Sequence, residues 1–186
     1  MDVLIQIDEH AAAGAEPMPS AEISERFLAA LGPHRGILYK VARTYGRSPE
    51  EREDIVQETV VQLWRAYPRY DPAFRFTTWM YRIALNTAIS WRRRERTQTQ
   101  HLHSVGEELL AGVAAVDAGE DADVVLLYRC IERYADLDKA LLMLYLDGQE
   151  QREIASVLGL TPTNVATRIG RLKERLRADF RAAGHL

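Results

Sequence analysis

Apolar residues recur three and four positions apart along most of the chain, which is the pattern of amphipathic helices packed against a core. In the first half, this pattern predicts helices over about 20–31, 34–45, 49–67 and 74–94. Ser48 and Pro49 mark the start of the third helix, because serine caps free backbone N–H groups and proline fits the first helical turn. The inward residues expected in the first two helices are Ile23, Phe27, Leu28, Leu31, Ile37, Leu38, Val41 and Tyr45.

The helix expected over 49–67 has two different faces. Its apolar face points inward and comprises Val56, Val60, Leu63, Trp64 and Tyr67. The opposite face is expected at the surface and comprises Asp54, Gln57, Glu58, Val61, Gln62 and Arg65. The carboxylates and amides of this second face suit a basic partner, and the alternative is a face that is merely solvated.

The segment 74–94 is apolar on nearly every side, so as a helix it must be largely enclosed by its neighbours. One polar stripe interrupts it and comprises Arg82, Asn86, Ser90 and Arg93. Aromatic residues cluster ahead of the stripe at Phe74, Phe76, Trp79 and Tyr81. Trp79 is expected in the core, whereas both a core position and a stacking role on nucleic-acid bases stay open for Trp91.

A stretch without periodicity, 97–121, divides the chain. It is rich in Gly, Ala and acidic residues, so we expect a flexible acidic linker. Helical patterns resume at Ala122, break at Asp147-Gly148, and continue over about 150–158 and 162–181. The apolar stripes of the first two helices after the linker are Val124, Leu127, Ile131 and Tyr134, then Leu137, Leu141, Leu144 and Tyr145.

Residues 151–170 carry a helix-turn-helix pattern. Ala155 is the small residue at which two helices cross, Gly159 suits a left-handed turn, and Val165 lies inside the second helix. Thr161 and Pro162 start that second helix, whose buried stripe is expected to be Val165, Ile169, Leu172 and Leu176. Its outward side carries asparagine, threonine and arginine, which suit base edges and phosphates of a DNA major groove. The alternative is an ordinary helical hairpin with a basic surface.

The net charge of −3 hides a segregated distribution. Basic residues cluster over 92–96 and 168–181, and acidic residues cluster between them over 107–123. Two basic patches joined by an acidic connector fit contacts with nucleic acid. Cys130 is the single cysteine, so an internal disulfide is excluded and a buried apolar position is expected. No apolar run reaches the roughly 18 residues of a membrane span, and the acidic N-terminus does not resemble a signal peptide.

Three segments in this order, DIVQETVVQLWRAY, TTWMYRIALNTAISWRRR and YLDGQEQREIASVLGLTPTNVATRIGRLKERLR, resemble the extracytoplasmic-function (ECF) sigma factors of bacterial RNA polymerase. The resemblance covers roughly residues 20–180 and implies an all-α protein of two small helical domains. It assigns 1–19 to a mobile tail, 20–96 to a sigma-2-like domain, 97–121 to the linker, and 122–186 to a sigma-4-like domain.

The resemblance also implies three binding surfaces. The polymerase-binding residues would be Asp54, Gln57, Glu58, Val61 and Gln62. The residues for the melted −10 promoter element would be Arg82, Asn86, Ser90, Trp91, Arg93 and Arg94. The residues for the duplex −35 element would be Thr161, Thr163, Asn164, Thr167, Arg168 and Arg171. Asn86 would hold an extruded base, a step whose cost must be returned by stacking and hydrogen bonds.

The implied partners are core RNA polymerase, through its largest-subunit coiled coil and its flap, and promoter DNA in duplex and melted form. An anti-sigma factor is a further partner expected in the family. A cytoplasmic location is expected, because a single cysteine fits a reducing compartment and no signal peptide is apparent. The main alternative is a helix-turn-helix regulator that binds DNA without polymerase. An enzyme is disfavoured, because the histidines are scattered and no catalytic arrangement stands out. The linker pair His101 and His103 is too sparse for a metal site, and no cofactor is expected.

Overall fold

The computed structural model of the chain describes residues 21–102 and 121–183, and the secondary structure in both stretches is helical. The first stretch comprises α1 (Ala21–Leu31), the 3-10 turn η2 (Gly32–His34), α2 (Arg35–Tyr45), α3 (Pro49–Ala66), the 3-10 turn η3 (Tyr67–Arg69) and α4 (Phe76–Leu102). The second comprises α5 (Ala122–Glu132), α6 (Asp136–Leu146), α7 (Gln151–Leu158) and α8 (Pro162–Ala182). The all-α prediction is confirmed, while the expected tail 1–19, the cap at Ser20 and linker residues 103–120 lie outside the described residues.

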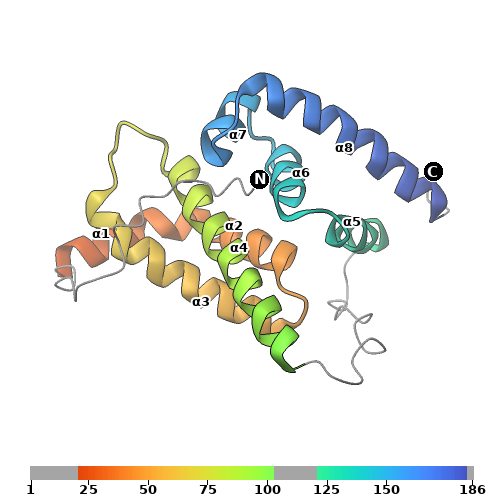
Figure 1. Cartoon of the computed structure of the whole chain (residues 1–186). Helices are drawn as coiled ribbons and strands as arrows, with labels where there is room; N and C mark the ends of the chain where they lie inside the picture. The colour runs from red at the N-terminus through yellow and green to blue at the C-terminus, as the bar shows by residue number, and fades with distance from the viewer. Residues whose placement is uncertain (1–20, 103–120, 184–186) are drawn as a thin grey trace.

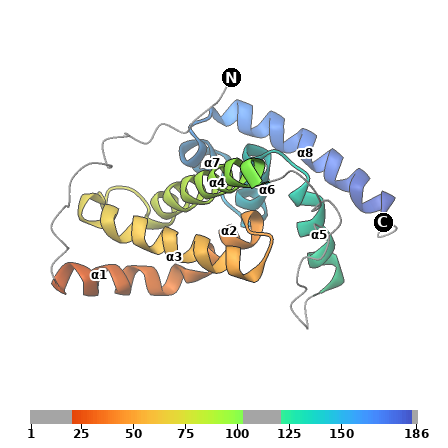
Figure 2. The same cartoon turned by 60° about the horizontal axis from the view of Figure 1, so that its bottom comes forward.

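The helices form two groups that lie against each other (Figures 1 and 2). We call α1–α4 the N-terminal domain and α5–α8 the C-terminal domain. Within the N-terminal domain, α2, α3 and α4 contact one another, and within the C-terminal domain α8 contacts α5, α6 and α7. The two domains meet where α4 contacts α7 and where α2 contacts α5 and α6.

The buried face of α3 is rotated relative to the predicted one. Ile55, Thr59 and Leu63 are its buried residues, whereas Val56 and Val60 are only partly buried. The Thr59 hydroxyl donates a hydrogen bond to the backbone oxygen of Ile55 at 2.7 Å, so its polar group is satisfied within the helix. The predicted inward face included neither Ile55 nor Thr59. The predicted cap is confirmed, since the Ser48 hydroxyl accepts from the backbone N–H of Glu51 at 3.2 Å.

α4 also departs from the expected bounds. It begins at Phe76 and continues to Leu102, so it extends into the first residues expected to form the linker. Phe74 lies in the preceding loop and is 65% exposed. The interior residues of α4 are buried against α2 and α3, as predicted. They are Met80, Tyr81, Ala84, Leu85 and Ala88.

Three of the predicted apolar stripes include an exposed residue. Leu28 of α1 is 63% exposed, and Val124 of α5 and Tyr145 of α6 are each 37% exposed, so these three inward assignments were wrong. In α6, every residue from Lys139 to Leu144 is buried. This helix contacts α7 and α8 on one side and α2 of the other domain on the other. A single stripe could not describe it, because α6 is enclosed by both domains.

Candidate nucleic-acid interface

The helix-turn-helix is present as predicted. Gly159 follows α7 with a backbone φ of 66°, in the left-handed region that favours glycine. Thr161 caps α8, because its hydroxyl accepts from the backbone N–H of Asn164 at 3.2 Å. Ala155 is 4% exposed at the helix crossing, where a larger side chain would separate α7 from α8. The buried residues of α8 are Val165, Ile169 and Leu172, and Leu176 is half-buried.

The outward side of α8 is open to solvent. Among the residues expected to bind the −35 element, those with exposed side chains are Thr161, Thr163, Asn164, Thr167 and Arg171. Arg168 is half-buried and forms an ion pair with Asp138 at 3.6 Å. An exposed amide and an exposed guanidinium on one helix can hydrogen-bond the edges of base pairs in a major groove.

The polar stripe of α4 is only partly free. Ser90 and Arg93 are exposed, and so is the adjacent Arg94, which forms an ion pair with Glu58 at 3.8 Å. Arg82 donates through Nη2 to the backbone oxygen of Ser156 in α7 at 2.6 Å. Asn86, one turn further along, is half-buried, and its Nδ2 is buried without a hydrogen-bond partner. The structure therefore keeps the stripe on one surface but places α7 at its beginning.

Aromatic side chains from η3, its flanking loop and α4 form a cluster at the start of this stripe. The Trp79 ring lies 5.1 Å from the Tyr70 ring and 5.4 Å from the Phe76 ring. Trp79 packs against the core as predicted, and Trp91 also lies partly buried against it. Phe74 is exposed in the loop before α4, next to Arg75 in the sequence, so the prediction that placed it inside a helix was wrong.

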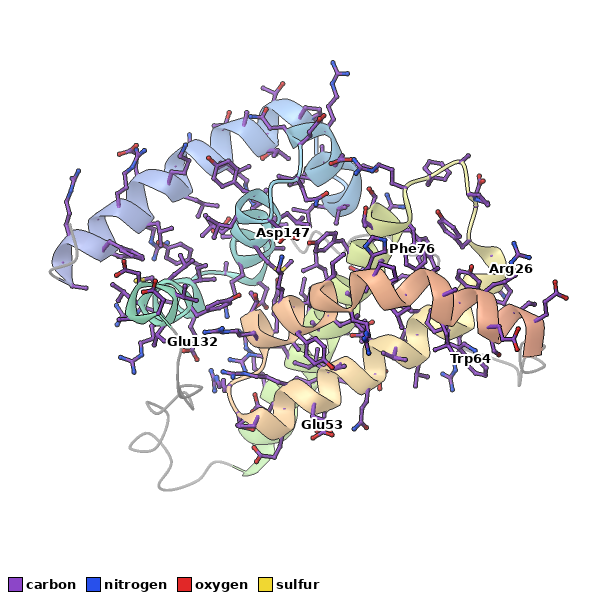
Figure 3. The ribbon with its side chains drawn as sticks, turned by 180° about the vertical axis from the view of Figure 1, so that it is seen from behind. Arg26, Glu53, Trp64, Phe76, Glu132 and Asp147 are labelled. Atoms are coloured by element: carbon purple, nitrogen blue, oxygen red, sulfur yellow. The ribbon has the colours of Figure 1, made fainter. Side chains whose placement is uncertain are left out.

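The acidic face of α3 lies at the surface. Asp54, Gln57 and Val61 are exposed, and Glu58 and Gln62 are half-buried. Amide side chains donate to carboxylates one turn away on this face, from Gln57 to Glu53 at 3.4 Å and from Gln62 to Glu58 at 3.2 Å. The result is an ordered surface of carboxylates and amides along one helix, with Glu53 labelled on it in Figure 3.

Polar contacts join the two domains. Asp147, at the end of α6, accepts from both Lys40 Nζ of α2 and the Tyr81 hydroxyl of α4, and Figure 3 shows it between the two groups of helices. Arg75, just before α4, pairs with Glu153 of α7. Further ion pairs between the domains join Arg47 to Glu132 at 3.7 Å and Arg96 to Asp136 at 3.4 Å.

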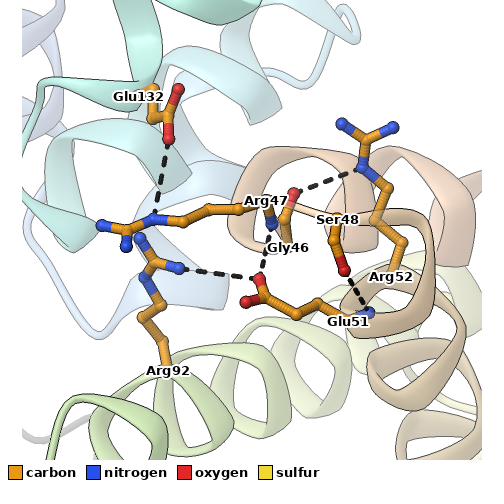
Figure 4. Close-up of polar contacts among 7 residues, drawn as sticks. All are labelled: Gly46, Arg47, Ser48, Glu51, Arg52, Arg92 and Glu132. Atoms are coloured by element: carbon orange, nitrogen blue, oxygen red, sulfur yellow. Dashed lines mark hydrogen bonds and ion pairs between the residues drawn. The ribbon is translucent and has the colours of Figure 1, made fainter. Parts of the chain in front are cut away.

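Two cations are buried where the domains meet. Arg92 of α4 is 3% exposed and reaches Glu51 at 3.9 Å, beside Arg47 and Glu132 (Figure 4). Lys139 of α6 is 1% exposed, with its Nζ 5.8 Å from the centre of the Tyr45 ring. Burial lowers the pKa of both side chains, and for Lys139 the nearby Arg92 cation lowers the pKa further, against the opposite effect of Asp136.

These interdomain residues were not found from the sequence. Lys40, Arg75, Asp147 and Glu153 look like ordinary surface charges, because each faces a partner that is distant in sequence. The charge pattern did separate basic from acidic segments, but nothing local indicated which residues would meet. The side chains of His101 and His103 lie outside those that the structure describes. Within the described helices, none is both long and apolar enough to cross a membrane.

A helix-turn-helix with an exposed polar recognition helix, joined to a second helical domain with an arginine and asparagine stripe, defines a two-domain DNA-binding protein. Family models agree with this architecture in both domains: Sigma-70 region 2 matches residues 31–98, and Sigma-70, region 4 matches residues 125–176. The first match covers α2, α3 and most of α4, and the second covers α7 and most of α8.

Individual sigma factors also match the chain, in sequence and in fold. The RNA polymerase sigma factor CnrH of Cupriavidus metallidurans is 32% identical over 171 residues, covering 86% of this chain and 89% of that protein. The ECF RNA polymerase sigma-E factor of Escherichia coli is 28% identical over 134 residues, covering 66% of this chain and 70% of that protein. The fold resembles that of the sigma factor RpoE from Bartonella quintana, solved with the anti-sigma factor NepR, with a TM-score of 0.68, 18% identity and coverage of 87% and 98%.

CnrH solved with the cytosolic domain of CnrY has a similar fold as well, with a TM-score of 0.60, 24% identity and coverage of 86% of this chain and 90% of that one. The chain belongs to the ECF group of the sigma-70 family of RNA polymerase sigma factors. It is therefore a sigma factor that directs RNA polymerase in promoter-specific transcription initiation, and it has no catalytic role of its own.

Proposed function

We propose that the polar stripe of α4 binds the melted non-template strand of the −10 element. Asn86 hydrogen-bonds an extruded base, while Arg82, Ser90, Arg93 and Arg94 hold the backbone, with Trp91 at the edge of the site. The support is that these side chains lie along one surface of α4 and that Ser90, Arg93 and Arg94 are exposed on it. Phe74 adds an exposed aromatic ring in the loop before α4, where it is suited to stack on a base.

The α8 surface is proposed to read the duplex −35 element. Asn164 and Arg171 are the residues suited to base edges, because their exposed amide and guanidinium can each form paired hydrogen bonds. Thr161, Thr163 and Thr167 are suited to phosphates near the start of the helix, where backbone N–H groups also attract anions. Arg168 would have to exchange its ion pair with Asp138 for a DNA contact.

Polymerase is proposed to bind at two places. The α3 face that contains Asp54, Gln57 and Glu58, with Val61 and Gln62, would dock on the largest-subunit coiled coil, because its carboxylates suit a basic partner. The C-terminal domain would contact the flap, for which Tyr145 and Leu146 offer apolar area, being 37% and 50% exposed.

An anti-sigma factor is proposed as a regulatory partner, supported by the relatives CnrH and RpoE, whose solved structures contain CnrY and the anti-sigma factor NepR. We also propose a cytoplasmic location, because a protein that works on polymerase and promoter DNA must reach both.

The proposal is tested by transcription in vitro with core polymerase and a library of genomic promoter fragments. The expected result is initiation from a restricted set of promoters only when both the chain and core polymerase are present. Specific promoter binding by the chain alone, unchanged by polymerase, would favour the rival function of a polymerase-independent regulator. Absence of any added initiation with core polymerase would overturn the assignment.

A further inference from the structure

Gly170 lies in the middle of the outward face of α8, among the residues that we propose to contact the −35 element. The helix runs unbroken from Pro162 to Ala182 (Figure 1), so Gly170 is far from both of its ends. Thr163, Thr167 and Gly170 follow one another at spacings of four and three, so they share one line on the helix surface, and all three are exposed. The glycine is therefore part of the proposed DNA-binding surface although it has no side chain with which to bind.

Nothing inside the described structure requires a glycine at this position. Among the described glycines, a positive φ occurs at Gly148 and Gly159, so Gly170 has a backbone conformation that alanine also adopts. A Cβ atom built on Gly170 would meet nothing within 4 Å apart from its immediate neighbours and the backbone of its own helix. The backbone conformation and the surrounding space would therefore both accept a larger residue.

Glycine in the interior of a helix lowers stability relative to alanine, because it loses more conformational freedom on folding. Other described glycines differ from Gly170 in this respect. A Cβ atom on Gly46 would lie 2.9 Å from the Arg52 side chain, so crowding requires a glycine there. Gly36 has open space around it but is only the second residue of α2, where the helix has barely begun. Gly170 destabilises a helix interior without a compensating contact in the described structure, which indicates a role toward a partner outside the chain.

We propose that Gly170 lets α8 approach the floor of the DNA major groove closely, and that the 5-methyl group of a thymine occupies the space left by the absent side chain. This inference rests on the proposed reading of the −35 element by α8. The partner is duplex DNA, because the exposed side chains of Asn164 and Arg171 on the same helix suit base edges. The size of the side chain at position 170 then sets how near the helix backbone comes to the base pair that faces it.

The group recognised is a methyl because glycine offers no side-chain donor or acceptor. The base pair opposite Gly170 is therefore distinguished by shape, and the thymine methyl is the apolar group that a base pair presents in the major groove. One turn earlier, the Thr167 hydroxyl donates to the backbone oxygen of Thr163 at 3.0 Å. In this rotamer the methyl group of Thr167 is free for an apolar contact beside the glycine.

The test adds one methyl group to the protein and removes one from the DNA. Gly170→Ala adds a Cβ atom to α8, and deoxyuridine in place of thymidine removes the 5-methyl group while keeping the base pair. The full chain is assembled with core polymerase, and its affinity is measured by competition against a labelled promoter fragment recovered from the library. Each thymine of the −35 element, on both strands, is replaced in turn. The control variant is Gly36→Ala, the same substitution at an exposed helical glycine of the N-terminal domain.

We expect Gly170→Ala to weaken binding of the unmodified promoter by about tenfold, because the added Cβ atom and the thymine methyl need the same space. The wild type should lose about fourfold at one particular thymine when its methyl group is removed. At that same position, the uracil promoter should restore the affinity of Gly170→Ala. Urea unfolding of Gly170→Ala should move to higher denaturant concentration, so weaker binding cannot come from loss of folding. Gly36→Ala should bind DNA like the wild type.

Binding by Gly170→Ala equal to that of the wild type on the unmodified promoter would overturn the inference. An equal loss on the thymine promoter and on every uracil promoter would also overturn it, because that result assigns Gly170 to bending of α8. Failure of the proposed function gives a different pattern, since Arg171→Ala and all thymine replacements would then leave promoter binding unchanged. A chain in which Arg171→Ala weakens promoter binding and Gly170→Ala does not refutes only the role of Gly170.

Discussion

The two helices proposed to contact DNA differ in how they meet solvent. The recognition side of α8 is open, with Asn164 and Arg171 exposed. The stripe of α4 is engaged by α7 at Arg82, and the amide nitrogen of Asn86 is buried without a partner. One surface is therefore open to a duplex, whereas the other contacts α7 of the C-terminal domain at its beginning.

This difference suggests an order of events. Duplex DNA is present before melting, so a permanently exposed α8 surface can find it without any change in the chain. A melted strand exists only once polymerase has begun to open the promoter, and the α4 stripe is needed only then. The contact between α4 and α7 joins the two surfaces, because α7 belongs to the helix-turn-helix and its Ser156 backbone oxygen accepts a hydrogen bond from Arg82 of the stripe.

The largest effect is expected from Ile154→Ala. Ile154 is fully buried in α7, and its truncation should cost the C-terminal domain about 2–5 kcal/mol of folding stability. All three tryptophans, Trp64, Trp79 and Trp91, lie in the N-terminal domain. Urea unfolding followed by circular dichroism should shift to lower denaturant, whereas tryptophan fluorescence should shift much less. Coincident shifts of both signals would show that the two domains unfold as one unit.

Asn86→Ala sharpens the comparison at α4. We expect a loss of about 2–3 kcal/mol in open-complex formation, because the extruded base loses its hydrogen bonds. Binding of −35 duplex should be unchanged. Folding stability should not fall, because the substitution removes an amide nitrogen that is buried without a partner. The measurements are permanganate footprinting of melted promoter and duplex binding by anisotropy. An equal loss of open-complex formation and of −35 duplex binding would contradict the role assigned to Asn86.

Arg171→Ala is the counterpart at α8. The expected loss is about 1–3 kcal/mol of −35 duplex binding if its guanidinium reads a base. Arg177→Ala is the matched control, because Arg177 lies on the same helix but pairs with Glu174. Binding of melted −10 strand should be unaffected by either variant. A neutral result for Arg171→Ala in duplex binding would exclude it from the recognition surface.

Much of the fold could be predicted because the signals were local. The Ser48 cap, the Thr161 cap and the left-handed Gly159 each depend on neighbouring residues, and the structure has all three. The buried stripe of α8 followed in the same way, since Val165 and Ile169 face helices of their own domain. The residues proposed to bind DNA and polymerase came from the resemblance to sigma factors, and their roles remain predictions.

The remaining features depend on contacts between distant segments. α6 is buried on every side between Lys139 and Leu144, because α2 of the other domain contacts the side that would otherwise face solvent. The pattern could not show that Lys139 is in this covered side, since a lysine in a helix is ordinarily exposed. Asp147 and Tyr81 likewise find each other only through the packing of the two domains. No local rule connects residues on separate domains that are divided by a linker.

Lys139→Met sharpens the same comparison with a smaller effect. The Lys139 ammonium is buried. Burial and the nearby Arg92 cation lower the pKa of Lys139, and the opposite effect of Asp136 and Glu132 on this pKa is smaller. Methionine has a similar length and no charge, so it removes the cost of a buried cation. We expect the free energy of unfolding to rise by about 1 kcal/mol.

The pH dependence gives this last prediction a second readout. Because the pKa of Lys139 is lowered in the folded chain, the unfolded chain binds more protons between the lowered and the ordinary lysine pKa. The wild type should therefore gain stability as pH rises toward the ordinary lysine value, and the advantage of Lys139→Met should shrink over the same range. Lys173→Met, at the half-buried lysine of α8 above Tyr145, is the control. A loss of stability in Lys139→Met alone would mean that attraction to Asp136 and Glu132 outweighs the burial of the ammonium, and that this lysine helps to hold the domains together.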